Sequence, residues 1–176
     1  MRELSVRRVY LSLGSNINRE QHITAALNAL DALFSPLIVS DAYDCQPVGF
    51  DGDNFLNLVV GFDTSHSVAE LSAMLTKIEN DNGRLRTGPK FSSRTLDLDI
   101  LTFGDEVGVI SGVTVPRGEI IENAFVLWPL SNVAGDELHP QLNKTYQALW
   151  QAYDKNSQSL SRINFTWHSP SADKVV

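Results

Sequence analysis

Residues 96–101 of the chain read Leu-Asp-Leu-Asp-Ile-Leu, an alternation of aliphatic and acidic side chains with a period of two. Because successive side chains of a β-strand point to opposite faces of a sheet, this pattern predicts a strand with Asp97 and Asp99 on one face. The aliphatic side chains then lie on the other face. One interpretation of the two aspartates is that they line the solvated side of a half-buried strand.

The residues before this strand predict alternating strands and helices. Residues 9–13 are rich in β-formers, and apolar side chains recur at helical spacing over residues 19–34. Residues 37–43 and 55–62 indicate two more strands, and a capping box at Ser67 begins a second helix. With the strand at 96–101, this order predicts a ferredoxin-like α+β sandwich, a mainly antiparallel sheet with helices packed on its faces.

The remaining residues predict two further helices, at 124–130 and 145–152. We expect one domain over residues 1–156, because the chain of 176 residues is of single-domain length. Residues 157–176 are polar and rich in serine, which predicts a partly flexible C-terminal extension with a strand at 162–167.

The composition narrows the classes of protein that need consideration. A net charge of −7 argues against an extended nucleic-acid surface, because binding of that kind requires many Lys and Arg side chains. The single cysteine, Cys45, excludes an internal disulfide, and no run of about 18 apolar residues is available to span a membrane. We expect a cytoplasmic monomer with small-molecule substrates and no nucleic-acid or membrane partner.

Basic residues lie just upstream of the two aspartates, at Arg84, Arg86, Lys90 and Arg94. Carboxylates that hold Mg²⁺, together with Arg side chains that bind phosphate, are what phosphoryl or diphosphoryl transfer requires. The sequence has no glycine-rich phosphate loop of the familiar kinds. The basic loop at 87–93 is therefore a candidate lid over a nucleotide.

Two phenylalanines and one asparagine are candidates for binding a flat heterocycle. Phe55 and Phe125 can stack on such a ring, although an isolated Phe is more often a core residue. Asn57 follows Phe55 by two residues on the same strand face, and its amide can pair with the polar edge of a pterin.

From residue 9 to residue 153 the sequence resembles the 6-hydroxymethyl-7,8-dihydropterin pyrophosphokinases of folate synthesis. The strongest segment is Arg-Thr-Leu-Asp-Leu-Asp-Ile-Leu at 94–101, followed by Phe103 and Gly104. Shorter segments support it at residues 13–16, 55–57, 78–79, 83–86, 114–116 and 125–130. The resemblance implies a ferredoxin-like fold and diphosphate transfer from ATP to the hydroxymethyl group of the pterin, with release of AMP.

The resemblance also implies roles for individual residues. Asp97 and Asp99 bind two Mg²⁺ ions that bridge the ATP phosphates, and Arg84 and Arg94 are the basic residues that engage the phosphates during transfer. Asn57, Phe55 and Phe125 hold the pterin. The catalytic loop spans residues 86–93, with Phe91 at a position where the family usually carries Trp. Arg86 and Lys90 are further candidates for ATP binding.

Three positions depart from the family pattern. After Pro116 the family usually carries His and then an aromatic residue, and it carries an Arg shortly before the helix at 124. The corresponding residues here are Arg117, Gly118 and Asn123. Arg117 is a candidate phosphate ligand, while a charge and an aromatic wall are lost at the other two positions. Two alternatives follow: a diverged paralogue that acts on another pterin-like alcohol, or a non-catalytic ferredoxin-like binding module.

Overall fold

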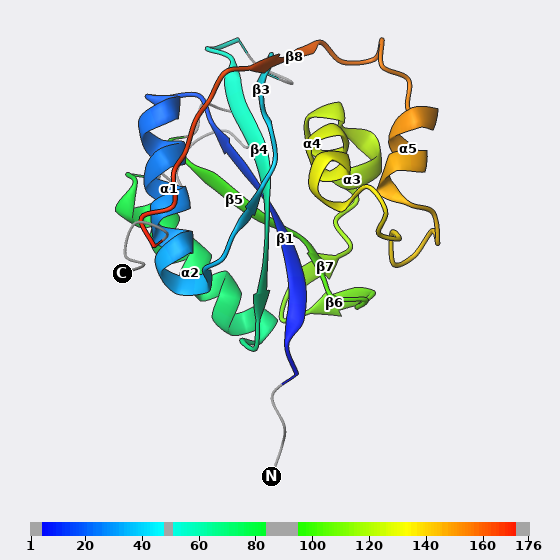
Figure 1. Ribbon diagram of the computed structural model, residues 1–176, viewed down its shortest axis with the longest axis horizontal. Coiled ribbons are helices and arrows are strands. Elements are labelled where there is room, and N and C mark those ends of the chain that lie inside the picture. The colour runs from blue at the N-terminus through cyan, green and yellow to red at the C-terminus, as the bar shows by residue number, and fades with distance from the viewer. Residues whose placement is uncertain (1–4, 48–50, 84–94, 172–176) are drawn as a thin grey trace.

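The computed structural model describes residues 5–47, 51–83 and 95–171 (Figure 1). Within these ranges the strands are β1 (Arg7–Ser15), β2 (Ile38–Val39), β3 (Ala42–Cys45), β4 (Phe55–Thr64), β5 (Asp97–Phe103), β6 (Gly108–Ile110), β7 (Val113–Val115) and β8 (Leu160–Ile163). The helices are α1 (Arg19–Phe34), α2 (Val68–Asp81), α3 (Glu119–Glu122), α4 (Ala124–Ala134) and α5 (Tyr146–Ala152).

An antiparallel six-stranded sheet forms the centre of the molecule. Its order is β5-β1-β4-β3-β8, and β2 pairs with β4 as well. The two longest strands, β1 and β4, are therefore central, and each helix of the β1-α1-β3 and β4-α2-β5 units connects strands that are not neighbours. This arrangement confirms the predicted ferredoxin-like α+β sandwich. Strands β6 and β7 form a separate hairpin.

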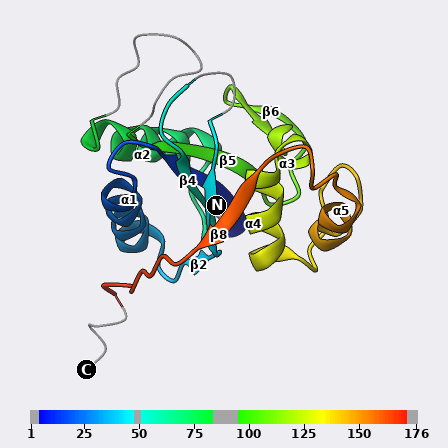
Figure 2. The same cartoon turned by 90° about the horizontal axis from the view of Figure 1, so that it is seen from above.

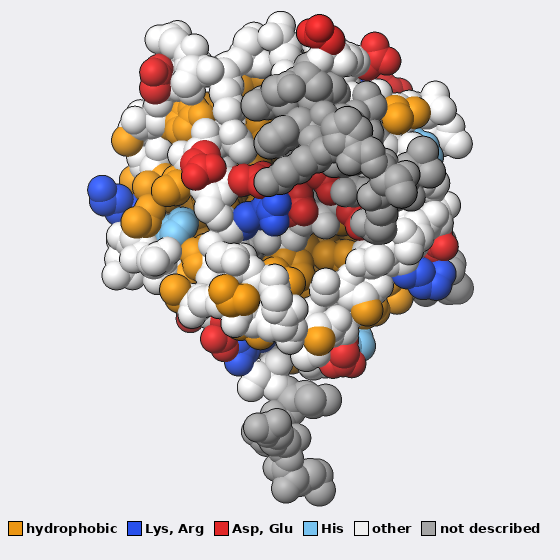
Figure 3. All heavy atoms as spheres, turned by 180° about the vertical axis from the view of Figure 1, so that it is seen from behind, with side chains coloured by type: hydrophobic (Ala, Val, Ile, Leu, Met, Phe, Trp, Pro, Cys, Tyr) orange, Lys and Arg blue, Asp and Glu red, His pale blue; other side chains and the backbone are white. Residues whose placement is uncertain are grey.

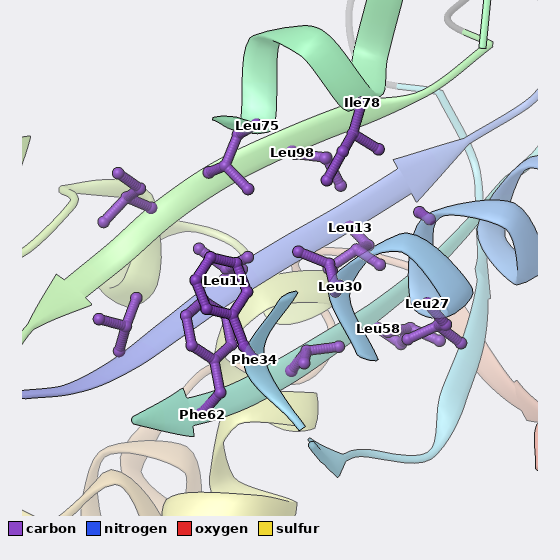
Figure 4. Packing of buried hydrophobic residues seen from close by; sticks show 14 of the residues in the cluster. Leu11, Leu13, Leu27, Leu30, Phe34, Leu58, Phe62, Leu75, Ile78 and Leu98 are labelled. Atoms are coloured by element: carbon purple, nitrogen blue, oxygen red, sulfur yellow. The ribbon is translucent and has the colours of Figure 1, made fainter. Parts of the chain in front are cut away.

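Helices α1 and α2 cover one face of the sheet (Figures 1 and 2). Apart from Leu33, which is exposed, the apolar residues that predicted α1 are buried. They meet alternate side chains of β1 and β4 such as Leu11, Leu13 and Leu58 (Figure 4). The rings of Phe34 and Phe62 stack with their centroids 4.2 Å apart. The alternation along β5 places Leu98 and Ile100 in this core. The expectation that all the aliphatic side chains of this strand lie here is wrong for Leu101, which is buried on the opposite face.

Helix α4 covers the opposite face, where α3 and α5 also lie (Figure 1). The core of this side joins Val59 of β4 and Leu101 of β5 to Leu127 and Leu130 of α4. Tyr43 of β3 packs its ring against Trp128 with centroids 4.5 Å apart. The Tyr43 hydroxyl donates a hydrogen bond to Oδ1 of Asn132 over 2.7 Å. These contacts hold the middle of α4 against the sheet face that carries the aspartates.

The strand predicted at residues 37–43 is divided into β2 and β3 by Ser40. The Ser40 hydroxyl oxygen accepts a hydrogen bond from the backbone N–H of Val59 at 2.8 Å, while the Ser40 N–H donates to the Val59 carbonyl at 2.9 Å. A side-chain oxygen thus replaces a backbone carbonyl in the ladder, so the prediction of one continuous strand is wrong at this residue.

The C-terminal extension adds β8 to the sheet beside β3. The strand covers residues 160–163, so the strand predicted at 162–167 begins two residues earlier and the prediction is wrong after residue 163. Trp167 then packs against the core of α1, and its Nε1 donates to Oδ1 of Asn28 over 2.9 Å. The Ser169 hydroxyl and the Ser171 N–H donate to Oδ2 of Asp31, at 2.9 and 3.1 Å.

Among the helices of the described ranges, none is long and apolar enough to cross a membrane.

Candidate active site

Two rows of residues cross the three strands at the centre of the candidate site. In the first row Gly14 of β1 lies opposite Asn57 of β4 and Asp97 of β5. In the second row Ser12 lies opposite Val59 and Asp99. Residues paired across antiparallel strands point to the same face, so Asn57 and both aspartates lie on the face that α4 covers. Strand β1 separates Asn57 from the two aspartates. At the usual spacing of strands, the backbones of β4 and β5 are therefore about 10 Å apart.

The absence of a side chain at Gly14 allows Asn57 to lie over β1. A Cβ at Gly14 would stand 2.7 Å from Oδ1 of Asn57 and 3.8 Å from Cδ1 of Phe55. The Asn57 side chain is 7% exposed and is thus held close to the Gly14 backbone. The role of Gly14 is not evident from its neighbours in the sequence, because its place between Asn57 and Asp97 depends on the strand register.

Asp99 lies in an environment that disfavours its charged form. The pKa of the Asp99 carboxyl is raised to about 7, mainly by burial and then by the neighbouring Asp97, while Arg117 opposes the shift. Nη2 of Arg117 lies 3.7 Å from Oδ1 of Asp99 and 2.8 Å from Oε1 of Glu119. The Arg117 backbone N–H donates to the Leu101 carbonyl at 2.8 Å, which fixes this residue beside β5.

The aspartate pair fits the predicted Mg²⁺. A cation next to two adjacent carboxylates removes the repulsion that raises the pKa of Asp99. The parts of the chain that the structure describes contain no group of three or more His, Cys, Asp or Glu residues that could hold a metal. Two protein carboxylates, with the other positions taken by phosphate and water, are a usual arrangement for Mg²⁺.

Glu79, at the end of α2, fixes the start of β5. Its Oε2 accepts a hydrogen bond from the backbone N–H of Leu98 at 2.9 Å, and the Glu79 side chain is 6% exposed. Leu98 lies between the two aspartates, so this bond connects α2 to the strand segment that presents them. Glu79 belonged to a segment of the family resemblance, but only the structure shows its contact.

A cavity of about 260 Å³ lies at the other side of the site. Its walls are residues 45–47 after β3, Phe125 in the first turn of α4, and residues 157–160 of the extension. Cys45 pairs with Phe55 across β3 and β4, which places Phe55 at the edge of the same region. Burial raises the pKa of the Cys45 thiol to about 12, a shift that the Asn57 side chain partly offsets. Cys45 is therefore a neutral wall residue at physiological pH.

The structure thus brings Asp97, Asp99 and Arg117 together, with Asn57 one strand away. Arg84, Arg86, Lys90 and Arg94 lie outside the described residues, and so does Phe91, so their roles stay predictions.

A Cβ added at Gly118 meets nothing within 4 Å, so this position leaves the space of an aromatic wall open. Oδ1 of Asn123 accepts a hydrogen bond from Nε2 of Gln158 at 2.8 Å. Acidic and basic side chains gather near the middle of one face in Figure 3.

The ferredoxin-like fold, with a carboxylate pair and Asn57 on one sheet face, agrees with the pyrophosphokinase class that the sequence resembles. A family model described as 7,8-dihydro-6-hydroxymethylpterin-pyrophosphokinase (HPPK) matches residues 10–135. Because this match covers most of the chain, the protein belongs to the HPPK family.

Relatives of known name agree with this assignment. The chain is 40% identical over 141 residues to the 2-amino-4-hydroxy-6-hydroxymethyldihydropteridine pyrophosphokinase of Pseudomonas aeruginosa, covering 74% of this chain and 83% of that protein. It is 36% identical over 135 residues to the protein of the same name from Haemophilus influenzae, covering 74% and 84% respectively.

The fold is shared with solved structures. Wild-type HPPK-DHPS of Plasmodium falciparum matches 86% of this chain with a TM-score of 0.66 and 14% sequence identity. This chain spans 45% of that longer chain. The likeness supports the fold, while the family assignment rests on the sequence matches.

Proposed function

We propose that the protein transfers the diphosphate of Mg·ATP to the hydroxymethyl group of 6-hydroxymethyl-7,8-dihydropterin and releases AMP, a step of folate synthesis. The observation that carries the proposal is the row Asn57, Gly14, Asp97, which puts a pterin-binding amide and a carboxylate pair on one face, one strand apart. The pyrophosphokinase name that the two bacterial relatives share supports the same chemistry.

Residues on one side of Gly14 bind the pterin, and residues on the other side bind the phosphates and the metal ion. Asn57 pairs its amide with the polar edge of the pterin, and Phe125 stacks on the ring from α4. Asp97 and Asp99 would hold Mg²⁺, which would neutralise charge on the phosphates. Arg117 supplies a further positive charge from the β5 side, together with Arg84 and Arg94, the expected phosphate ligands.

The transfer itself makes one bond and breaks one. The pterin hydroxymethyl oxygen attacks the β-phosphorus of ATP, the bond from this phosphorus to the oxygen of the α-phosphate breaks, and AMP leaves with that oxygen. The hydroxyl proton is lost to solvent or to a phosphate oxygen. Because the step requires little covalent chemistry from the protein, positioning and charge neutralisation are the main contributions.

The test is release of AMP from ATP by the purified protein, with and without the hydroxymethyl-dihydropterin. We expect release only when both the pterin and Mg²⁺ are present. Asp97→Asn and Asp99→Asn should each lower kcat by at least about 100-fold with the fold retained, since each removes one of the two charges for the cation. Asp136→Asn removes the same charge at an exposed turn and should leave kcat unchanged. Near wild-type turnover of either site variant contradicts the metal assignment.

A second candidate is transfer to another pterin-like alcohol. The open space at Gly118 and the engagement of Asn123 by Gln158 favour it, because both alter the side of the site where the family carries an aromatic residue and an Arg. A panel of pterin alcohols in the same AMP assay separates the two: a higher kcat/KM for another alcohol would favour the second function.

A further inference from the structure

The C-terminal extension contributes one wall of the cavity that contains Phe125. After α5 the chain crosses above α4 to reach β8 and then descends along α1 (Figure 1). Residues 157–160 line the cavity opposite residues 45–47. Leu160 pairs with Cys45 in the β3–β8 ladder, so this wall is held by backbone hydrogen bonds to β3.

Gln158 reaches from this wall to the N-terminus of α4. Its Oε1 accepts a hydrogen bond from the Ala124 backbone N–H at 2.8 Å, and its Nε2 donates to Oδ1 of Asn123 at 2.8 Å. Asn123 occupies the N-cap position of α4, but its side chain makes no capping hydrogen bond. Gln158 therefore caps this helix from a distant part of the sequence.

The position of Gln158 is fixed on both sides. Two residues later the chain enters the β8 pairing with β3. One residue earlier, the Ser157 hydroxyl donates to the Tyr153 hydroxyl oxygen at 3.2 Å, and the Tyr153 hydroxyl donates to the Glu122 carbonyl at 2.8 Å. The extension thus contacts the start of α4 directly and the end of α3 through Tyr153. Gln158 therefore binds the residue immediately before Phe125, the aromatic side chain that lines the cavity.

We infer that Gln158 is a positioning residue for the heterocycle site: it holds the N-terminus of α4 so that Phe125 faces the cavity that residues 157–160 close. This inference rests on the proposed function for the identity of the heterocycle. The cavity of about 260 Å³ is below the roughly 300–1,000 Å³ of pockets for drug-sized ligands, which suits a small bicyclic ring.

The test compares two substitutions at Gln158 in the full-length protein. Gln158→Ala removes both hydrogen bonds and should raise KM for the pterin about fivefold, with KM for ATP and kcat within twofold of wild type. Gln158→Glu keeps an oxygen that accepts from Ala124 N–H at the positive end of the helix, while the Asn123 amide can turn to donate. Gln158→Glu should therefore restore KM for the pterin. Gln151→Ala, the same truncation at an exposed residue of α5, is the matched control.

Amide hydrogen exchange at Ala124 gives a readout that needs no substrate. We expect faster exchange in Gln158→Ala and wild-type exchange in Gln158→Glu. An unchanged KM for the pterin in Gln158→Ala overturns the inference, and so does an equal loss of ATP and pterin binding, which indicates a purely structural role. If the wild type releases no AMP with the pterin, the proposed function fails, and exchange at Ala124 still decides the positioning role: unchanged exchange in Gln158→Ala overturns it.

Discussion

Gly14 separates the pterin side of the candidate site from the phosphate side. We expect Gly14→Ala to raise KM for the pterin roughly tenfold, because the new Cβ would stand 2.7 Å from Oδ1 of Asn57 and the short, buried amide must turn away. Steady-state kinetics with each substrate varied in turn measures this effect. Ala73→Ser, a change of one atom at an exposed position of α2, is the control. Unchanged pterin KM in Gly14→Ala contradicts the placement of Asn57.

Arg117 occupies a position where the family usually carries His. We expect Arg117→Met to lower ATP affinity roughly tenfold while pterin affinity is unchanged, because one charge near the phosphates is lost. Arg117→His should bind ATP progressively more weakly as pH rises from about 6 to 8, since an imidazole near its ordinary pKa loses its charge over this range. Calorimetric titration of an ATP analogue measures both.

The control for the two Arg117 variants is Arg8→Met. This substitution breaks the ion pair between Arg8 and Asp63 at the far end of β1. Equal ATP affinity in the wild type and Arg117→Met would show that Arg117 serves only to pair with Asp99 and Glu119. The arginine does not titrate near neutral pH, so the wild type should lack the pH dependence that Arg117→His gains.

The site residues that could be predicted from the sequence are those that belong to a local pattern of spacing along the chain. Alternation placed Asp97 and Asp99 on one face, and spacing by two placed Asn57 on the same face as Phe55. Gly14 and Gln158 carry no such local pattern. Their roles depend on which strands pair and on where the extension returns, which the periodicity of a single segment does not specify.

At the scale of elements, helices and long strands with a clear period were predicted well. The helix at 19–34 matches α1, and the capping box at Ser67 begins α2 as expected. The short elements between β5 and α4, which are the β6–β7 hairpin and α3, were not predicted because they are too short to show a period. Ser40 interrupts a predicted strand through a side-chain hydrogen bond, a tertiary contact that propensity does not contain.

Over the whole molecule, the second helical layer decides where the site lies. The first layer, α1 and α2, buries the aliphatic face of the sheet and leaves the polar row of Asn57, Gly14 and Asp97 to the other face. Helix α4 covers only part of that face, and its first turn meets the extension. The extension continues to α1, where Asp31 accepts hydrogen bonds from Ser169 and Ser171. The division of the chain at residue 156 remains a prediction, but these contacts connect residues 157–171 to both helical layers.

Stability of the whole fold should depend on the protonation of His139 in the turn between α4 and α5. This side chain is 4% exposed, and its Nδ1 accepts hydrogen bonds from the backbone N–H groups of Gln141 and Leu142, at 3.2 and 3.1 Å. Burial lowers the pKa of His139 below its ordinary value near 6.5. The folded state therefore binds this proton less readily than the unfolded chain.

The sign of the pH effect follows from that difference in proton binding. The stability contributed by neutral His139 is fully present above pH 6.5 and is lost as pH falls from there toward the lowered pKa, by at most about 1.4 kcal/mol per pH unit. His139→Asn keeps an oxygen that can accept both N–H groups and does not protonate, so its free energy of unfolding should change less between pH 7 and pH 5. Urea denaturation across this range measures the difference, with His168→Asn at an exposed position as the control. Equal slopes in the wild type and His139→Asn would mean that His139 is protonated in the folded state as readily as in the unfolded chain, and that the two backbone N–H groups are not its fixed partners.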